Sequence, residues 1–355
     1  MSERRSNCPP CRRALPAAAA CLVAALAVAR AAPPAGVRAD VGRVAAVGAW
    51  AADNSAPAGV GRVAVADADH AWAIAGDLTY AWTSGAWSVV GNPGYSGQYF
   101  TDFYVRDANN AWLAGWRRTT YQGSPCNCGF LLRWNGTSWQ VEQDIIPLLI
   151  VAITLPEDDF GLAIGYEGVA GGERSYRWDG SDWLPVAFPG YGYALAAASE
   201  NSAWAVDSNG AMLRFQAGAW SPWAVVGNPV ISSLAVVADD FGAAFGIFGE
   251  IRHWNGTAWQ AVASPITGNV SDVGLASPTE GWTVGGAGLT LHWDGTAWTP
   301  VVDPVASQLH TVALAAPDVG WGIGPNLVAR YNPPPPIQSP TPTPTATTGP
   351  SPTLT

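Results

Sequence analysis

Lysine is absent from this 355-residue chain, so arginine supplies all 17 of its basic residues. Charged residues make up only 12% of the sequence, while hydrophobic residues make up 48%. Five arginines and one glutamate lie in the first 31 residues, which leaves 12 basic against 26 acidic residues in the rest. The resulting net charge of −14 repels nucleic acid and anionic lipid, so we expect neither as a general partner.

Cysteine is also scarce, and three of the five cysteines (Cys8, Cys11 and Cys21) lie near the N-terminus. That region has a cluster of arginines, an apolar run over about residues 14–28 and a small-x-small sequence at 29–31, which is typical of a secretory signal. We therefore expect a signal peptide at 1–31 and a short leader segment at 32–43. A retained membrane anchor is the alternative. After signal cleavage we expect no membrane span and a protein that is secreted or located at the cell surface.

The remaining cysteines, Cys126 and Cys128, are separated only by Asn127. Three states are open: a disulfide at a loop tip, two free thiols, or half of a metal site. Export favours the disulfide, although the short separation disfavours an unstrained bridge. No histidine is next to the pair in sequence, so we expect no metal site.

Common catalytic motifs are missing as well. The sequence has no H-E-x-x-H, no G-x-S-x-G, no phosphate-binding glycine loop and no pair of C-x-x-C motifs. We therefore expect no cofactor, and a non-catalytic protein is favoured over an enzyme.

What the chain has in abundance is tryptophan, with 19 residues, and these recur in a repeat of about 40 residues. One repeated position follows a polar turn and is called the anchor here. The anchors are Trp72, Trp112, Leu162, Trp204, Ala243, Trp282 and Trp321. A second feature is an aromatic residue with tryptophan five positions later. These pairs are Trp82/Trp87, Trp134/Trp139, Trp178/Trp183, Phe215/Trp220, Trp254/Trp259 and Trp293/Trp298.

Seven anchors but six pairs indicate that one repeat is split between the two ends of the chain. Tyr331 has no tryptophan five residues later, whereas Trp50 near the N-terminus follows a Gly-Ala sequence like that of the other closing units. We therefore predict a seven-bladed β-propeller of four-stranded blades over residues 44–332. An N-terminal strand around Trp50 would complete the last blade, and this closure removes unpaired strand edges.

The third and fourth strands of a blade are joined by Asn-Gly or Asp-Gly, as at Asn135-Gly136, which favours a two-residue hairpin turn. With that turn Leu132 would face Trp139, and Trp134 and Trp139 would be diagonal neighbours on one sheet face. We expect each pair to pack against the next blade. This packing accounts for the tryptophan content without a ligand.

The repeat pattern (G/A)-W-x-(V/I)-G … (H/R)-W-(D/N)-G-T-x-W resembles the Asp-box (BNR-like) repeats of exported bacterial propellers. It is most similar in style to photosystem II assembly-factor-like and sialidase-type repeat proteins. The resemblance covers about residues 44–332 and implies a propeller. Sialidase-type members would need clustered arginines, a tyrosine nucleophile with a glutamate, and an acidic aspartate, and no residues are assigned to these roles. The acidic candidates for such an enzyme are the pair Glu157/Asp158, or Glu173, and nothing in the sequence places them together.

A basic residue or histidine precedes the third-strand aromatic in six blades. These residues should form a ring and are Arg133, Arg177, Arg214, His253, His292 and Arg330. We favour arginine side chains covering tryptophan rings over a ring that binds an anionic ligand.

Blades one to three depart from the repeat on the opposite face, where the loops gain aromatic residues and arginines. Such loops are typical of binding surfaces; ordinary loop packing is the alternative. The candidate residues are Tyr95, Tyr99, Phe100, Trp116, Arg117, Arg118, Tyr121, Phe188, Tyr191 and Tyr193.

The last segment, 333–355, is rich in proline and threonine and is expected to be a disordered, extended tail. Together these features predict a monomeric, exported binding module for an unknown protein or glycan at the cell surface. The alternative from the resemblance is a sialidase-like carbohydrate-active enzyme.

Overall fold

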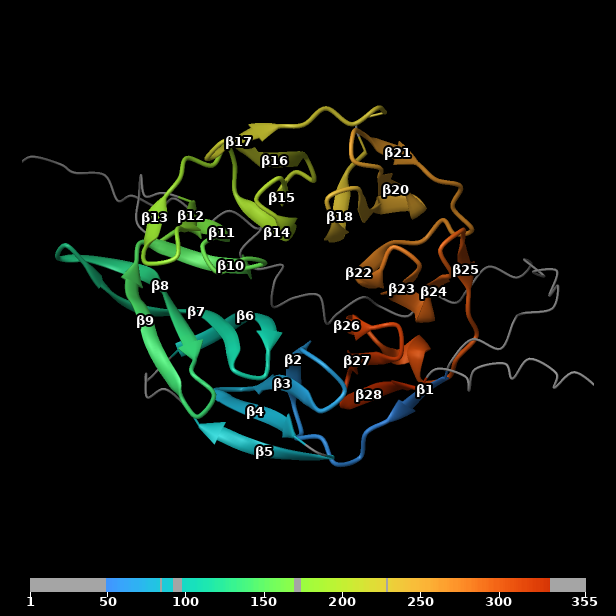
Figure 1. The fold of residues 1–355 in the computed structure, drawn as a ribbon, viewed down its shortest axis with the longest axis horizontal. Helices are drawn as coiled ribbons and strands as arrows, with labels where there is room; N and C mark the ends of the chain where they lie inside the picture. The colour runs from blue at the N-terminus through green and yellow to red at the C-terminus, as the bar shows by residue number, and fades with distance from the viewer. Residues whose placement is uncertain (1–48, 84, 92–97, 169–173, 228, 333–355) are drawn as a thin grey trace, which may run out of the picture. The chain divides into compact units, whose positions relative to one another are not determined.

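A computed structural model describes residues 49–332 except 84, 92–97, 169–173 and 228. These residues form seven antiparallel sheets of four strands each, arranged as successive blades (Figure 1). The prediction of a seven-bladed propeller is therefore confirmed. The predicted signal peptide, leader segment and tail lie outside the described residues.

The first three blades contain β2 to β13. Blade one has β2 (Val60–Val65), β3 (His70–Ala75), β4 (Leu78–Thr83) and β5 (Ala86–Gly91). Blade two has β6 (Gln98–Asp107), β7 (Asn110–Tyr121), β8 (Ser124–Trp134) and β9 (Trp139–Ile146). Blade three has β10 (Leu148–Thr154), β11 (Gly161–Glu167), β12 (Ser175–Trp178) and β13 (Trp183–Pro185).

The remaining four blades differ little from one another in strand length. Blade four has β14 (Gly192–Ser199), β15 (Ser202–Asp207), β16 (Met212–Gln216) and β17 (Ala219–Pro222). Blade five has β18 (Ile231–Ala238), β19 (Phe241–Gly246), η1 (Ile247–Gly249), β20 (Ile251–Trp254) and β21 (Trp259–Ala261). Blade six has β22 (Val270–Ser277), β23 (Glu280–Gly285), η2 (Gly286–Gly288), β24 (Thr290–Trp293) and β25 (Trp298–Pro300). After η3 (Ala306–Gln308), blade seven has β26 (Thr311–Ala316), β27 (Val319–Gly324), β28 (Leu327–Asn332) and β1 (Ala49–Ala52).

The N-terminal strand closes the ring, as predicted. β1 pairs antiparallel with β28, and Trp50 lies opposite Tyr331. The buried carboxylate of Asp303 accepts the backbone N–H of Trp50 at 2.9 Å and those of Val305 and Ala306 at 2.8 and 2.9 Å. One side chain in the connection from blade six thus fixes both its own loop and the closing strand.

The core between blades is built from anchors and aromatic pairs. The ring of Trp204 in blade four lies 4.7 Å from that of Trp254 and 5.4 Å from that of Trp259, both in blade five. The expectation that a pair packs against the next blade is wrong, because the pair packs against the anchor of the preceding blade. Trp204 lies opposite Arg214, so these two side chains share one face of the sheet. Phe215 is the next residue after Arg214 and points to the other face, because side chains alternate along a strand. Anchor and pair therefore point from opposite faces of their own blade.

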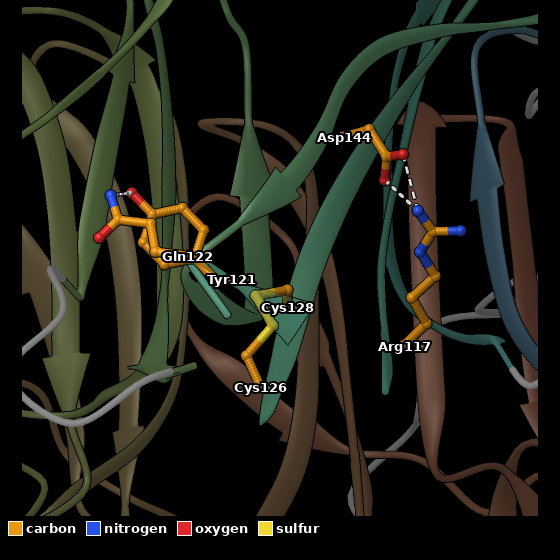
Figure 2. The surroundings of a disulfide bond; sticks show 6 residues. All are labelled: Arg117, Tyr121, Gln122, Cys126, Cys128 and Asp144. Carbon is orange, nitrogen blue, oxygen red and sulfur yellow. Dashed lines mark hydrogen bonds and ion pairs between the residues drawn. A yellow bond between two sulfur atoms is a disulfide. The ribbon is translucent and has the colours of Figure 1, made fainter. Parts of the chain in front are cut away.

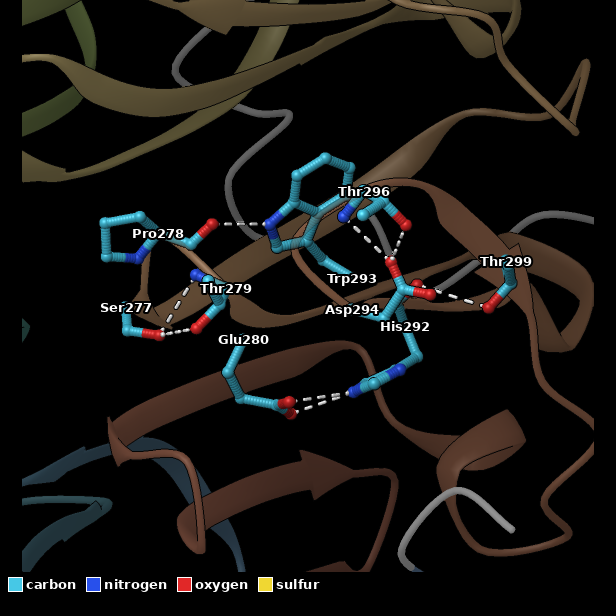
Figure 3. A network of polar contacts seen from close by, with 9 residues as sticks. All are labelled: Ser277, Pro278, Thr279, Glu280, His292, Trp293, Asp294, Thr296 and Thr299. Atoms are coloured by element: carbon cyan, nitrogen blue, oxygen red, sulfur yellow. Dashed lines mark hydrogen bonds and ion pairs between the residues drawn. The ribbon is translucent and has the colours of Figure 1, made fainter. Parts of the chain in front are cut away.

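The two-residue hairpin predicted at the Asn-Gly and Asp-Gly sites between strands three and four is also wrong. In blade six Asp294 accepts the backbone N–H of Thr296 at 2.9 Å and the Thr296 hydroxyl at 2.7 Å (Figure 3). It also accepts the backbone N–H of Ala297 at 2.9 Å. These bonds stabilise a four-residue turn, so Trp293 lies directly opposite Trp298. Only glycine takes a positive φ here, 89° at Gly295. The hydrogen bond from Thr296, followed by those from the backbone, lowers the pKa of Asp294 to about 2.

The first tryptophan of a pair also ties two turns together. The Trp293 indole N–H donates to the carbonyl of Pro278, in the turn between strands one and two, at 2.9 Å (Figure 3). The same bond recurs in three more blades. It joins Trp134 to Ala108, Trp178 to Asp158 and Trp254 to Asp239. A buried indole thus satisfies its one donor and holds both turns at the same end of the blade.

Candidate functional site

The antiparallel strand order divides the turns between two faces. The repeat-turn face carries the turns between strands one and two and between strands three and four, such as 278–279 and 294–297. The loop face carries the turns between strands two and three and the blade-to-blade connections, such as 208–211 and 223–230. The aromatic and arginine-rich departures from the repeat belong to the loop face.

Blade two extends on this face as a long hairpin. β7 and β8 pair as far as Tyr121 and Ser124, whereas β6 stops at Gln98, opposite Arg117, and β9 stops opposite Gly129. Residues 118–128 therefore form a two-stranded arm beyond the rest of the sheet, and Figure 1 shows it projecting past the neighbouring blades. The N–H of Asn127 donates to the carbonyl of Gly168 at 3.3 Å, which joins the arm to blade three.

The arm contains a disulfide between Cys126 and Cys128, whose sulfur atoms are 2.07 Å apart (Figure 2). Alternate residues of a strand point to the same face, so both sulfur atoms lie on one side of β8. The bridge is within the strand rather than at the tip, which is formed by Gln122 and Gly123, and both cysteines are buried. The expected loop-tip location is thus corrected.

The base of the arm presents a stacked aromatic pair. Tyr99 is 56% exposed and lies parallel to Trp116, with ring centroids 4.5 Å apart. Next to Trp116, Arg117 makes an ion pair with Asp144 on β9 at 2.7 Å (Figure 2). This arginine therefore braces the arm, whereas Arg118 is exposed.

Other predicted face residues divide between surface and core. Phe188 is buried against Trp220, with ring centroids 5.3 Å apart, so its assignment to the binding surface is wrong. Phe100 is half-buried and contacts the ring of Phe130 at 6.0 Å. Tyr121 is half-buried on the arm, and Tyr95 lies outside the described residues.

A second aromatic group lies in blades three and four. Tyr191 stacks on Tyr166 at 5.5 Å, and the Arg174 guanidinium lies 4.6 Å from the centre of the Tyr191 ring. Arg174 also makes an ion pair with Glu167, and Tyr193 is 44% exposed. Sequence reasoning missed Tyr166 and Arg174 because they flank a short segment with no aromatic cluster of its own.

The residues of the Arg/His ring pack on aromatic rings. Arg214 lies 5.3 Å from the ring of Trp204, and Arg330 lies 4.9 Å from that of Trp321. Arg133 lies 5.4 Å from the ring of Trp112, while Arg177 covers Phe160 and makes an ion pair with Glu200. These contacts support the structural interpretation of the ring.

The two histidines of the ring also have structural partners. Nε2 of His253 accepts the indole N–H of Trp298 in the next blade at 2.8 Å, and burial lowers the pKa of His253 to about 4. Nε2 of His292 lies 2.9 Å from Glu280 (Figure 3). The imidazole of His253 therefore joins two blades, and that of His292 makes a contact within its own blade.

A channel of ≈ 310 Å³ runs along the axis and is lined by the first strand of every blade. Asp102 and Asp272 lie on these strands and accept the N–H of Ile153 and Val312 in the following blades, each at 3.0 Å. Burial raises the pKa of Asp102 and raises that of Asp272 to about 6. Arg62 lies 3.9 Å from Asp102. These carboxylates join neighbouring blades.

Metal-binding and membrane-spanning features are considered within the part of the chain that the structure describes. There, no group of three or more His, Cys, Asp or Glu residues could hold a metal ion. No helix among the described residues has the length and apolarity needed to cross a membrane. Of the acidic candidates for catalysis, Asp158 pairs with Arg106 on the repeat-turn face, and Glu173 lies outside the described residues.

No family model matches the sequence, and no curated protein matches it. Solved structures do show similarity. YCF48 bound to D1 peptide is 21% identical with a TM-score of 0.61, covering 81% of this chain and 99% of that one. YCF48 from Cyanidioschyzon merolae is 15% identical with a TM-score of 0.59, covering 80% and 99%. A streptogramin B lyase is 11% identical with a TM-score of 0.63, covering 80% and 97%.

At these identities the similarity shows the fold alone. The chain is a seven-bladed β-propeller, and its likeness to photosystem II assembly-factor propellers holds at the level of fold. Assignment of the repeat to the Asp-box type stays a prediction.

Proposed function

We propose that this chain is an exported, non-catalytic propeller that binds a protein or glycan at the cell surface through the loop face of blades two to four. The observation that carries the proposal is the two-stranded arm at 118–128. It extends beyond its sheet, yet an ion pair between Arg117 and Asp144 at its base and a hydrogen bond from Asn127 to Gly168 of blade three hold it in place. A packing requirement alone would not extend one blade in this way.

The surface beside the arm has the composition of a binding site. Exposed Tyr99 offers a flat ring supported by Trp116. Arg118 on the arm and Tyr193 on β14 of blade four are also exposed on this face. Rigid aromatic residues and arginines contribute most to protein interfaces. A stacked ring of this kind also suits the apolar face of a sugar, which keeps a glycan as the second candidate.

The test uses two probes with the full chain: a random dodecapeptide display library and a glycan array. We expect specific binding to one probe. Replacing Tyr99, Arg118 and Tyr193 together by alanine should weaken that binding at least tenfold. The control variant replaces Val141 and Leu184, which are 51% and 48% exposed on the outer strands of blades two and three. Binding that is equally sensitive to both variants would contradict the proposal.

A panel of chromogenic glycosides separates the binding module from the sialidase-like alternative. We expect no turnover. Turnover that disappears on replacing a single carboxylate would instead favour an enzyme.

A further inference from the structure

Phe248 is in an unusual position on the loop face of blade five. It lies in the turn between β19 and β20 with φ 61° and ψ 26°, and it is 79% exposed. A bulky residue in this left-handed region is a conformational outlier, because its Cβ is crowded by the backbone. Phe248 thus has a strained backbone conformation, while its phenyl ring gains little burial.

Blade six has the same turn without the phenyl ring. Ala287 occupies the matching position with φ 59° and ψ 26°. The closing hydrogen bonds also match: Gly246 N–H to Glu250 O and Gly285 N–H to Leu289 O are both 2.9 Å. Since alanine makes an equivalent turn, the ring of Phe248 is not needed to build it.

Two exposed valines on an adjoining segment extend the apolar surface. Val226 is 83% exposed and Val230 is 43% exposed, both in the connection from β17 to β18. The carbonyl of Val230 accepts the Ile247 N–H at 3.1 Å, and that of Val226 accepts from buried Arg252 at 2.8 Å. Val226, Val230 and Phe248, here called the apolar patch, therefore have a fixed backbone.

Backbone hydrogen bonds connect the segment that carries the apolar patch to the aromatic group of blades three and four. The Ser208 N–H donates to the carbonyl of Tyr191 at 2.8 Å, and the Ile231 N–H donates to that of Gly210 at 3.0 Å. A connected path of turns on one face thus leads from Tyr191 through 208–210 to Val230 and on to Phe248.

We propose that the apolar patch is a second docking point for an extended segment of a partner protein, which would bring an apolar side chain to Phe248 and a basic one to Glu250. This inference rests on the proposed function and names its partner as a peptide. Glu250 follows the turn and makes an ion pair with Arg252. The Glu250 side chain is 33% exposed, so a carboxylate reaches solvent at the edge of the patch.

Other occupants fit the patch less well. Valine and phenylalanine side chains offer no hydrogen bonds to sugar hydroxyls. A second copy of this acidic chain would bring surfaces of like charge together, and anionic lipid would be repelled in the same way.

The test selects a random dodecapeptide display library on the full chain and measures the affinity of a synthetic consensus peptide by fluorescence anisotropy. We expect the consensus to contain an apolar residue and an Arg or Lys, with binding that weakens as salt increases. Phe248→Ala should weaken binding at least tenfold, and Val226→Ala about threefold. Val302→Ala is the matched control, because Val302 is 99% exposed on the same face outside the patch and should leave affinity unchanged.

Phe248→Gly separates binding from folding. Glycine adopts positive φ without strain, so this variant should have an equal or higher Tm and yet bind the peptide weakly. A purely structural phenylalanine would not give this combination.

Four outcomes would overturn the inference. If Tyr99 and Arg118 variants lose the peptide while Phe248→Ala keeps it, the proposed function stands and the apolar patch is excluded. Glycan-array binding that depends on Phe248, or self-association in sedimentation that Phe248→Ala abolishes, would assign the patch to another occupant. If the library yields no peptide, the inference fails, and binding of glycans through Tyr99 decides whether the proposed function survives.

Discussion

The two faces of the propeller differ in how many of their side chains make contacts that stabilise the fold. On the repeat-turn face, turn residues such as Asn255 and Asp294 accept hydrogen bonds from the backbone of their own turn. Indole groups such as that of Trp293 then tie one turn to another. On the loop face, exposed Tyr99 and Phe248 contribute little burial.

This difference explains why the repeat is clear in the sequence and the function is not. Residues that recur from blade to blade are those that each blade needs in order to fold and pack. Residues that depart from the repeat, such as Phe248 in place of an alanine, are released from that requirement. Substitutions on the two faces should therefore separate stability from binding.

The largest expected effect is at the ring closure. Trp50→Ala removes a buried ring that lies 5.7 Å from Trp282 and 5.4 Å from Tyr331, and should lower the free energy of unfolding by about 3–5 kcal/mol. Trp116→Ala on the loop face is the control and should cost about 1 kcal/mol or less. Urea denaturation followed by tryptophan fluorescence gives both values. Similar losses in the two variants would break the comparison.

A slightly smaller effect is expected from Asp303→Ala, which leaves the N–H groups of Trp50, Val305 and Ala306 without their acceptor. We expect a loss of about 2–4 kcal/mol, because unpaired buried donors are costly. Hydrogen exchange should show faster opening of β1 than of β15. Asp77→Ala, at an exposed turn, serves as the control; opening of every blade to the same extent would argue against a local closure role for Asp303.

The pH dependence of stability should sharpen the comparison next. The folded-state pKa of His253 is lowered to about 4, so its contribution is present above pH 6.5 and is lost as pH falls towards 4. The folded-state pKa of Asp272 is raised to about 6, so its charged form destabilises the fold as pH rises from about 4 through 6. The two groups therefore oppose each other between pH 4 and 6.

Asp272→Asn should stabilise the protein at pH 7.5 by about 1–2 kcal/mol, and this gain should disappear near pH 4. The variant should also lose stability more steeply than the wild type on acidification, since the effect of His253 is then unopposed. Urea midpoints from pH 4 to 8 measure both. Asp77→Asn controls for the removal of one negative charge, and a pH-independent gain in Asp272→Asn would contradict the burial argument.

The smallest effect concerns a single turn of the repeat. Asp294→Ala should cost about 1 kcal/mol above pH 4, because Thr296 and Ala297 lose their acceptor. The cost should fade as pH drops towards 2, where Asp294 becomes protonated. Asp294→Asn should retain most of the stability, since Asn255 makes the same bonds in blade five. On the loop face, Arg118→Ala should stay within about 0.5 kcal/mol of the wild type.

Much of the architecture could be predicted because it is periodic. Seven anchors gave seven blades, and the missing partner of Tyr331 identified Trp50 as the closing residue. Turn length was predicted wrongly, because a dipeptide such as Asp294-Gly295 does not reveal that the carboxylate will accept two backbone N–H groups beyond it. That error shifted the expected partner of Trp298 by two residues.

The binding surface was less accessible to sequence reasoning. Aromatic content alone selected both Tyr99, which is exposed, and Phe188, which is buried against Trp220. Arg117 was expected on the surface, yet it braces the arm through Asp144, 27 residues away in sequence. The composition of a loop does not determine which of its side chains face solvent.

The sequence by itself determined the number of blades, the strand that closes the ring and the aromatic pairs, because these features repeat at a fixed spacing and depend on local strand geometry. The tertiary structure alone decided which blade each pair contacts, that Asp303 holds Trp50 from 253 residues away, and that Phe248 stands exposed where blade six has Ala287. These outcomes depend on how separate blades meet in space. A linear pattern specifies each blade, but the contacts between blades arise only when the ring closes.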